Sequence, residues 1–164
     1  MKKLFLVSLA VLLMGGVAWA ISFPQSEKGD VGPYVWTVPV YNNSGSNMPA
    51  GTVAVWQITS STGDDDNYVT TSTDVDTFLV AGVIYPNAIA STDTGTMAVH
   101  GVVTVLVGPD GVAEGSLLCV DNTTAGLANN CSSLTDDSNA FGFATTGVLT
   151  HGTYAEVKAF LFGR

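Results

Sequence analysis

The sequence is short of positive charge. Its 164 residues contain five lysines and arginines against 14 aspartates and glutamates, which gives a formal net charge of −9. Nucleic-acid binding rests largely on cationic contacts to phosphate, so this balance argues against a nucleic-acid partner. The same acidity opposes binding to anionic membrane surfaces and favours solubility.

The sequence also lacks a helical pattern. No window of 11 or more residues repeats apolar side chains at the helical period. Short runs rich in Val and Thr stand instead between clusters of Gly, Pro, Asn, Asp and Ser. The sequence therefore predicts an all-β fold, a small antiparallel barrel or sandwich. The expected strands cover residues 34–42, 51–59, 77–86, 95–107, 114–121, 141–149 and 152–162.

One long apolar run is present, at the N-terminus, and it is short for a membrane span. Lys2 and Lys3 precede the apolar residues 4–14, and small residues follow at Ala18 and Ala20. Eleven residues do not cross a bilayer, whereas a basic start, an apolar core and a small-residue exit are typical of a secretory signal peptide. We expect cleavage after Ala20 and no stable membrane span afterwards.

The expected organisation is a signal peptide over 1–20, an N-terminal arm over 21–33 and a single β domain over 34–164. Cleavage would leave three cations against the 14 acids. The expected location is extracellular or at the cell surface, with the periplasm as a further option.

Cysteine is scarce, because the sequence contains only two cysteines, Cys119 and Cys131. An even pair in an exported chain favours a disulfide. No CxxC motif occurs and neither histidine is near in sequence, so a metal site is the weaker interpretation. Free thiols are the other alternative.

Catalytic motifs are missing as well. The two histidines, His100 and His151, accompany no GxSxG elbow and no HExxH zinc motif. Both are expected to be structural or exposed, with His100 beside a bulge at Gly101. Paired carboxylates of a glycosidase need a buried cleft, whereas the acids here stand in short polar loops. The sequence predicts that this protein is not an enzyme.

The loop acids are the better candidates for ligand binding. Asp64, Asp66, Asp74 and Asp76 alternate along two loops and supply the oxygen ligands that Ca²⁺ prefers. The EF-hand pattern fails, because the required Gly and Glu do not follow. A solvated acidic loop is the alternative, so no cofactor is expected, and Ca²⁺ stays open as a ligand.

No stripe of aromatic residues marks a sugar platform. Trp36, Trp56 and Tyr68 could form a small patch, but tryptophan in a strand is expected in the core. Three sequons match the pattern for N-glycosylation, at Asn42, Asn122 and Asn130.

The β part of the sequence reads as two similar halves. "MPAGTVAVWQ" lies over "VAEGSLLCVD", "STDVDTFLVAGVIY" over "LTDDSNAFGFATTG", and "TGTMAVHGVVTVLVG" over "HGTYAEVKAFLFG". The last alignment places Gly95 on Gly152. Two such units can cover each other's apolar faces. Chance similarity between Thr/Val/Gly-rich strands is the alternative.

Residues 50–162 resemble the bacteriophage capsid-cement (head decoration) proteins. The resemblance is carried by "AGTVAV", "VAGVI", "GTMAVHGVVTVLV", "EGSLLCVD", "FGFATTG" and "GTYAEVKAFL". It implies a compact β-barrel-like domain that packs, often as trimers, on an assembled protein lattice. Cement proteins carry neither a signal peptide nor a disulfide, so the resemblance implies the fold and the assembly behaviour in an exported form.

These observations favour a secreted structural subunit that self-associates or coats a larger assembly, such as a filament, a surface layer or a decoration. Exposed strand edges and the N-terminal arm, with Ile21, Phe23, Tyr34 and Trp36, are the expected contacts between copies. The alternative is a secreted β module that binds Ca²⁺ or a glycan.

Overall fold

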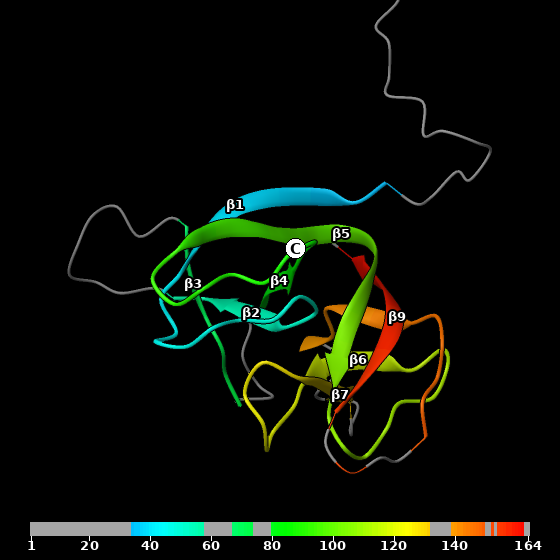
Figure 1. The fold of residues 1–164 in the computed structure, drawn as a ribbon. Coiled ribbons are helices and arrows are strands. Elements are labelled where there is room, and N and C mark those ends of the chain that lie inside the picture. The colour runs from blue at the N-terminus through cyan, green and yellow to red at the C-terminus, as the bar shows by residue number, and fades with distance from the viewer. Residues whose placement is uncertain are drawn as a thin grey trace, which may run out of the picture. The chain divides into compact units, whose positions relative to one another are not determined.

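A computed structural model describes residues 34–57, 67–73, 80–131, 139–149, 152 and 154–162. Figure 1 shows the fold, and the described residues contain strands and no α-helix. The all-β prediction is therefore confirmed. The strands are β1 (Trp36–Asn42), β2 (Val53–Trp56), β3 (Tyr68–Thr70), β4 (Val80–Ile84), β5 (Thr94–Val107), β6 (Leu117–Val120), β7 (Ala128–Asn130), β8 (Gly142–Ala144) and β9 (Ala155–Phe162).

The strands pair in the order β1-β3-β2-β4-β5-β7-β6-β8-β9, and β5 pairs in addition with both β1 and β9. The pairing of β1 with β5 closes a five-stranded barrel over β1, β3, β2, β4 and β5, which we call the first ring. The pairing of β5 with β9 closes a second ring over β5, β7, β6, β8 and β9. The two rings share β5.

The two rings repeat one pairing scheme. The first and third strands are parallel in each ring, with Asn42 opposite Val69 in one and Val107 opposite Ala128 in the other. All the other pairs are antiparallel. A short bridge outside the strands also recurs, at Met48–Ile89 and at Val112–Val148. The two similar β units expected from the sequence are present.

Two of the three sequence alignments have the wrong register. The second places Gly82 on Ala144, although Gly82 and Gly142 pair with equivalent residues, Ala54 and Leu118. The cross-strand partner of Val83 is Ala98 and that of Phe143 is Phe160, which makes Ala98 and Phe160 equivalent. Gly95 therefore corresponds to Val157, and not to Gly152. The correction has a physical cause: the matching Gly-Thr pairs at Gly95 and Gly152 set the sequence alignment, whereas cross-strand packing selects the register.

Two equivalent glycines mark this register. A Cβ on Gly82 would collide with the carbonyl oxygen of Ala98, and a Cβ on Gly142 would lie 2.5 Å from the carbonyl oxygen of Phe160. Neighbouring backbones approach closely at the same place in both rings, and only a residue without a side chain fits there.

The shared strand β5 bends as it passes from the first ring to the second (Figure 1). The pairing with β1 shifts register between Trp36 and Thr37, where His100 and Ala98 are their partners. Gly101 follows with φ +107°, a conformation that favours glycine. The expected bulge beside His100 is confirmed, and it redirects β5 into the second ring.

The interior of the first ring is a separate apolar cluster. Its buried members come from all five strands and from the bridge loops, and they include Val40, Ala54, Val69, Ile84 and Met97. Trp56 packs partly against this cluster. Trp36, by contrast, is 65% exposed, so the expectation of a core position is wrong for this residue.

The second cluster joins the interior of the second ring to the outer face of the first. Val53, Val83 and Ala98 belong to it, although they point away from the first ring's interior. They are 1%, 0% and 0% exposed, because the second ring covers them. Burial on both faces explains why every residue of β4 is buried, and it makes one packed body of the two rings.

Candidate interaction surface

A continuous row of aromatic rings crosses the surface of the second ring and reaches β1. Trp36 contacts His100 at 5.2 Å between ring centroids, and His100 contacts Phe160 at 5.1 Å. Phe143 then contacts both Phe160 and Phe162, at 5.6 and 6.0 Å. Each distance lies in the range of favourable aromatic pairing. We call these five residues the aromatic face.

Strand pairing holds the aromatic face in place. Phe143 of β8 stands directly opposite Phe160 of β9, and His100 of β5 stands opposite both Trp36 and Phe162. Along β9 the buried Val157, Ala159 and Leu161 alternate with the outward residues Glu156, Lys158, Phe160 and Phe162. The outward side of this strand is the one that normally meets water.

The aromatic face remains accessible. Trp36 is 65% and Phe162 is 40% exposed, and the other three members are half-buried. Tyr34, two residues before Trp36, is 76% exposed. Soluble proteins seldom leave apolar rings contiguous on the surface unless they contact a partner. The geometry therefore marks this face as an interaction surface.

The rings do not form a flat platform. Consecutive planes are tilted by 45° from Trp36 to His100 and by 79° from His100 to Phe160. A sugar ring needs a flat aromatic plane and nearby polar groups, whereas Phe143, Phe160 and Phe162 have no polar atom in their side chains. An apolar protein surface suits this ridge better than a glycan does.

His100 lies within this row and not within a catalytic constellation. Its ring neighbours are Trp36 and Phe160. Its expected role as a strand residue beside a bulge agrees with this position. His151 lies outside the described residues.

A shallow pocket of about 450 Å³ lies apart from the aromatic residues, around the Val112–Val148 bridge. Its titratable groups are Asp110 and Glu114, and the rest of its lining is Asn130, small or apolar residues. Among the described residues, no serine, threonine, cysteine or histidine lines it.

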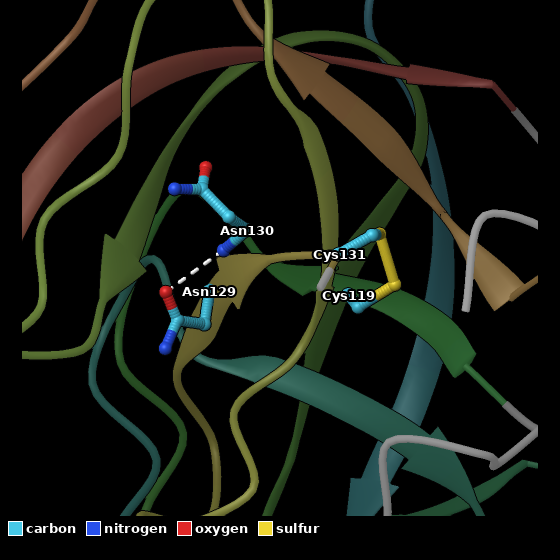
Figure 2. The surroundings of a disulfide bond; sticks show 4 residues. All are labelled: Cys119, Asn129, Asn130 and Cys131. Carbon is cyan, nitrogen blue, oxygen red and sulfur yellow. Dashed lines mark hydrogen bonds between the residues drawn. A yellow bond between two sulfur atoms is a disulfide. The ribbon is translucent and has the colours of Figure 1, made fainter. Parts of the chain in front are cut away.

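The predicted disulfide between Cys119 and Cys131 is present. It joins β6 to the residue after β7, with the two Cα atoms 5.1 Å apart. Figure 2 shows the bridge beside Asn129 and Asn130, and the backbone N–H of Asn130 donates to Oδ1 of Asn129. The bridge fastens β7, which has only three residues, to its neighbour β6.

The three sequons differ in accessibility. Asn42 is fully buried, and its Nδ2 donates to the carbonyl oxygens of Ser46, Ile89 and Ala90. Its side chain therefore serves as a structural clamp. Asn122 and Asn130 are exposed.

Asp121 is a buried carboxylate with a structural function. Its Oδ1 accepts hydrogen bonds from the backbone N–H groups of Thr123 and Thr124 and from the Thr123 hydroxyl, at 2.6–2.7 Å. Its Oδ2 accepts from Asn129 Nδ2 at 3.3 Å. These bonds shape the turn between β6 and β7, which is an Asx-type turn.

The four candidate Ca²⁺ ligands lie outside the described residues, as do Ile21 and Phe23 of the arm. Among the residues that the structure does describe, no three His, Cys, Asp or Glu side chains gather into a group that could hold a metal ion. No helix within the described ranges is long and apolar enough to cross a membrane.

Sequence reasoning missed Phe143, Phe160 and Phe162. A signal was present in "AEVKAFLF", where the two phenylalanines alternate in phase with Glu156 and Lys158 and so fall on the polar side of the strand. Large aromatic rings on the same side of a strand as its charged residues indicate an apolar patch on the surface.

Neither a family profile nor a curated protein sequence matches this chain. A similar solved structure is the crystal structure of the head fiber gp8.5 N base in bacteriophage phi29, with a TM-score of 0.51 and 16% sequence identity. The match covers 77% of this chain and 94% of that chain. At this identity the likeness concerns the fold, and the fold of this chain is thus similar to that of a phage head-fiber base.

Proposed function

We propose that this protein is an exported, non-enzymatic structural subunit that self-associates or coats a larger assembly. The observation that carries this proposal is the aromatic face, five contiguous rings left accessible on a strand surface. Burial of such rings between proteins stabilises an interface through apolar area and ring packing.

Two further features support the proposal. The head-fiber base, whose fold is similar, is by its name part of a structure on a phage head. A distant relationship to head-decoration proteins, in fold and assembly behaviour, fits both this likeness and the resemblance in sequence. Export is supported by the signal-peptide pattern of residues 1–20 and by the disulfide, which persists in oxidising compartments.

Electron microscopy of the purified mature protein, residues 21–164, tests the proposal. We expect filaments, a lattice or regular oligomers. Single particles of monomer size at every protein concentration would contradict self-association.

The arm gives a second test. Deletion of residues 21–33 is expected to leave the β domain folded, because the described strands begin at Trp36, and to weaken assembly. Light scattering measures the mass of the oligomer, and circular dichroism checks the fold. An unchanged oligomer mass after the deletion would remove the arm from the proposal.

No cofactor is needed for this role. Titration with Ca²⁺ in a calorimeter is expected to show no binding that stabilises the fold. Binding with a clear rise in the free energy of unfolding would instead favour a Ca²⁺-binding module.

A further inference from the structure

Comparison of the two rings identifies a face of the second ring that is exposed although the equivalent face of the first ring is buried. In the first ring, Val53, Val83 and Ala98 form a cross-strand row over β2, β4 and β5. We call it the covered row, because the second ring buries all three residues. In the second ring, Leu117, Phe143 and Phe160 occupy the equivalent cross-strand positions over β6, β8 and β9.

This second set, the open row, is apolar like its counterpart but is not fully buried. Leu117, Phe143 and Phe160 are all partly exposed, whereas the covered row is at most 1% exposed. The two phenylalanines are also the centre of the aromatic face. The open row therefore has the apolar composition of a buried surface, but no neighbouring ring buries it in the described residues.

Equivalent glycines show the same contrast. Gly51 and Gly115 begin the second strand region of each ring, and both have positive φ, +88° and +83°. A Cβ on Gly51 would lie 3.0 Å from Cγ of Leu106 in the second ring. A Cβ on Gly115 would meet nothing within 4 Å. The surfaces around Gly51 and Gly115 are thus equivalent, but the one around Gly51 is covered by Leu106 and the one around Gly115 is exposed.

The residues that cover the first ring also have equivalents. Leu106 of β5 and Gly126 before β7 flank the segment Gly51–Val53: the Leu106 N–H donates to the Gly51 carbonyl at 2.9 Å, and the Val53 N–H donates to the Gly126 carbonyl at 2.8 Å. The parallel pairs of the two rings make Tyr41 the equivalent of Leu106 and Asn67 the equivalent of Gly126.

Tyr41 and Asn67 belong to a surface of the first ring that no other ring covers within the described residues. Tyr41 and Tyr68 make an edge-to-face pair at 4.9 Å, and both rings are half-buried. We call Tyr41, Asn67 and Tyr68 the head surface. In repeat proteins each unit packs on its neighbour in the same way, and the terminal faces need caps.

We propose that the open row of one molecule packs on the head surface of another copy, so that copies associate head to tail. The occupant is inferred from the chain itself, since the equivalent face of the first ring is already covered by the following ring. A contact between two different surfaces repeats without closing unless the rotation returns to its start, and it produces fibres or large rings. This inference rests on the proposed function and identifies its contact.

Charge permits this contact although the whole molecule is acidic. β1 and β3 contain no charged residue, and β6, β8 and β9 contain one acid and one base, Glu156 and Lys158. The strands that meet therefore oppose no like charges, although Asp66 adjoins Asn67 and Glu114 adjoins Gly115 in sequence.

One difference from the internal contact bears on its strength. In the first ring the Tyr41 N–H donates directly to the Asn67 carbonyl at 2.9 Å, so no neighbouring strand inserts there. Side-chain packing then provides the contact between copies without the two added backbone hydrogen bonds. We expect reversible association that grows with protein concentration.

The test uses two surface variants of the mature protein and their mixture. F143S/F160S removes the open row, and Y41S/Y68S removes the head surface; each is expected to weaken association by about tenfold or more. Each variant keeps one intact surface, so an equal mixture is expected to form dimers and nothing larger, measured by sedimentation velocity. L149S, at an exposed leucine outside both surfaces, is the control and should associate like the unmodified protein.

Other outcomes overturn the inference. If Y41S/Y68S associates normally while F143S/F160S does not, the contact joins two open rows face to face. If both variants still assemble like the unmodified protein, this contact is excluded, whereas the proposed structural function stands. If the unmodified protein never assembles, the proposed self-association fails together with the inference.

Disulfide cross-linking tests the same contact if a double variant does not fold. Copies with L117C and copies with N67C are mixed under mild oxidation and examined by electrophoresis without reductant, because their equivalents Val53 and Gly126 are hydrogen-bonded in the internal contact. A linked dimer that requires both variants supports head-to-tail packing. Linkage of L117C to itself, or no linkage, overturns it.

Discussion

At the scale of single residues, Asn42 shows how one polar side chain organises the first ring. It is fully buried at the end of β1, and its amide nitrogen donates to three carbonyl oxygens, of Ser46, Ile89 and Ala90. Its oxygen accepts from the backbone N–H and the hydroxyl of Ser44. The amide thus satisfies two turns that would otherwise hold unpaired buried groups.

N42D tests this assignment. Aspartate keeps the shape and the oxygen that faces Ser44 but directs a second oxygen at three carbonyls. We expect the free energy of unfolding to fall by about 3 kcal/mol, because a buried donor is lost and a charge is buried. N43D, at the adjacent exposed asparagine, is the matched control. Equal stability of the two variants in urea denaturation would refute the clamp.

At the scale of elements, β7 is the strand of the second ring that is held by few backbone pairs. It has three residues, and its contact with β5 is one residue pair, Val107–Ala128. Its main partner is β6, through three residue pairs and the disulfide. The second ring therefore depends on the bridge to keep β7 in place.

C119A/C131A is expected to lower the free energy of unfolding by about 3 kcal/mol, the loop-entropy value for a bridge across 12 residues. The loss should be local. Hydrogen exchange is expected to accelerate at β7 and the turn before it, while the amides of β2 and β4 stay protected. Uniform acceleration through both rings would show that the bridge supports the whole fold instead.

Much of the element order could be predicted from the sequence. Gly51 and Gly115 start equivalent strands, as the first alignment of the halves expected, because a turn with positive φ leaves a glycine that sequence comparison detects. The strands expected from the sequence do not include the short strands β3 and β7. Their residues, such as Asn129 and Asn130, favour turns, and tertiary pairing decides their conformation.

The interaction surface was harder to predict than the fold. Trp36 was placed among the contact residues on the ground of its place near the arm, and the structure shows it exposed beside His100. Phe143 and Phe160 come from strands that are adjacent in space and separate in sequence. Within the described residues no further ring covers them as the second ring covers Val83 and Ala98, and no local pattern reports this.

At the scale of the whole molecule, substitutions at the equivalent glycines Gly51 and Gly115 test how much the second ring contributes to the stability of the first. G51A and G115A introduce the same backbone strain, since both φ values are near +85°. G51A also forces a methyl group against Leu106, so we expect it to cost about 1–3 kcal/mol more in a dilute monomer. Thermal or urea unfolding of both variants gives the comparison, and equal losses would mean that the rings hardly support each other.

The pairing of Trp36 and Phe162 with the same residue, His100, has a mechanical consequence. The described chain begins and ends on opposite sides of one strand, about 10 Å apart if each side takes one strand spacing. A force that pulled these two ends apart would peel β1 and β9 from β5 one residue pair at a time, and strands that unzip in this way resist little load. A thread of these molecules would be far stronger if tension passed through the surfaces between copies than if it passed through the ends of each chain.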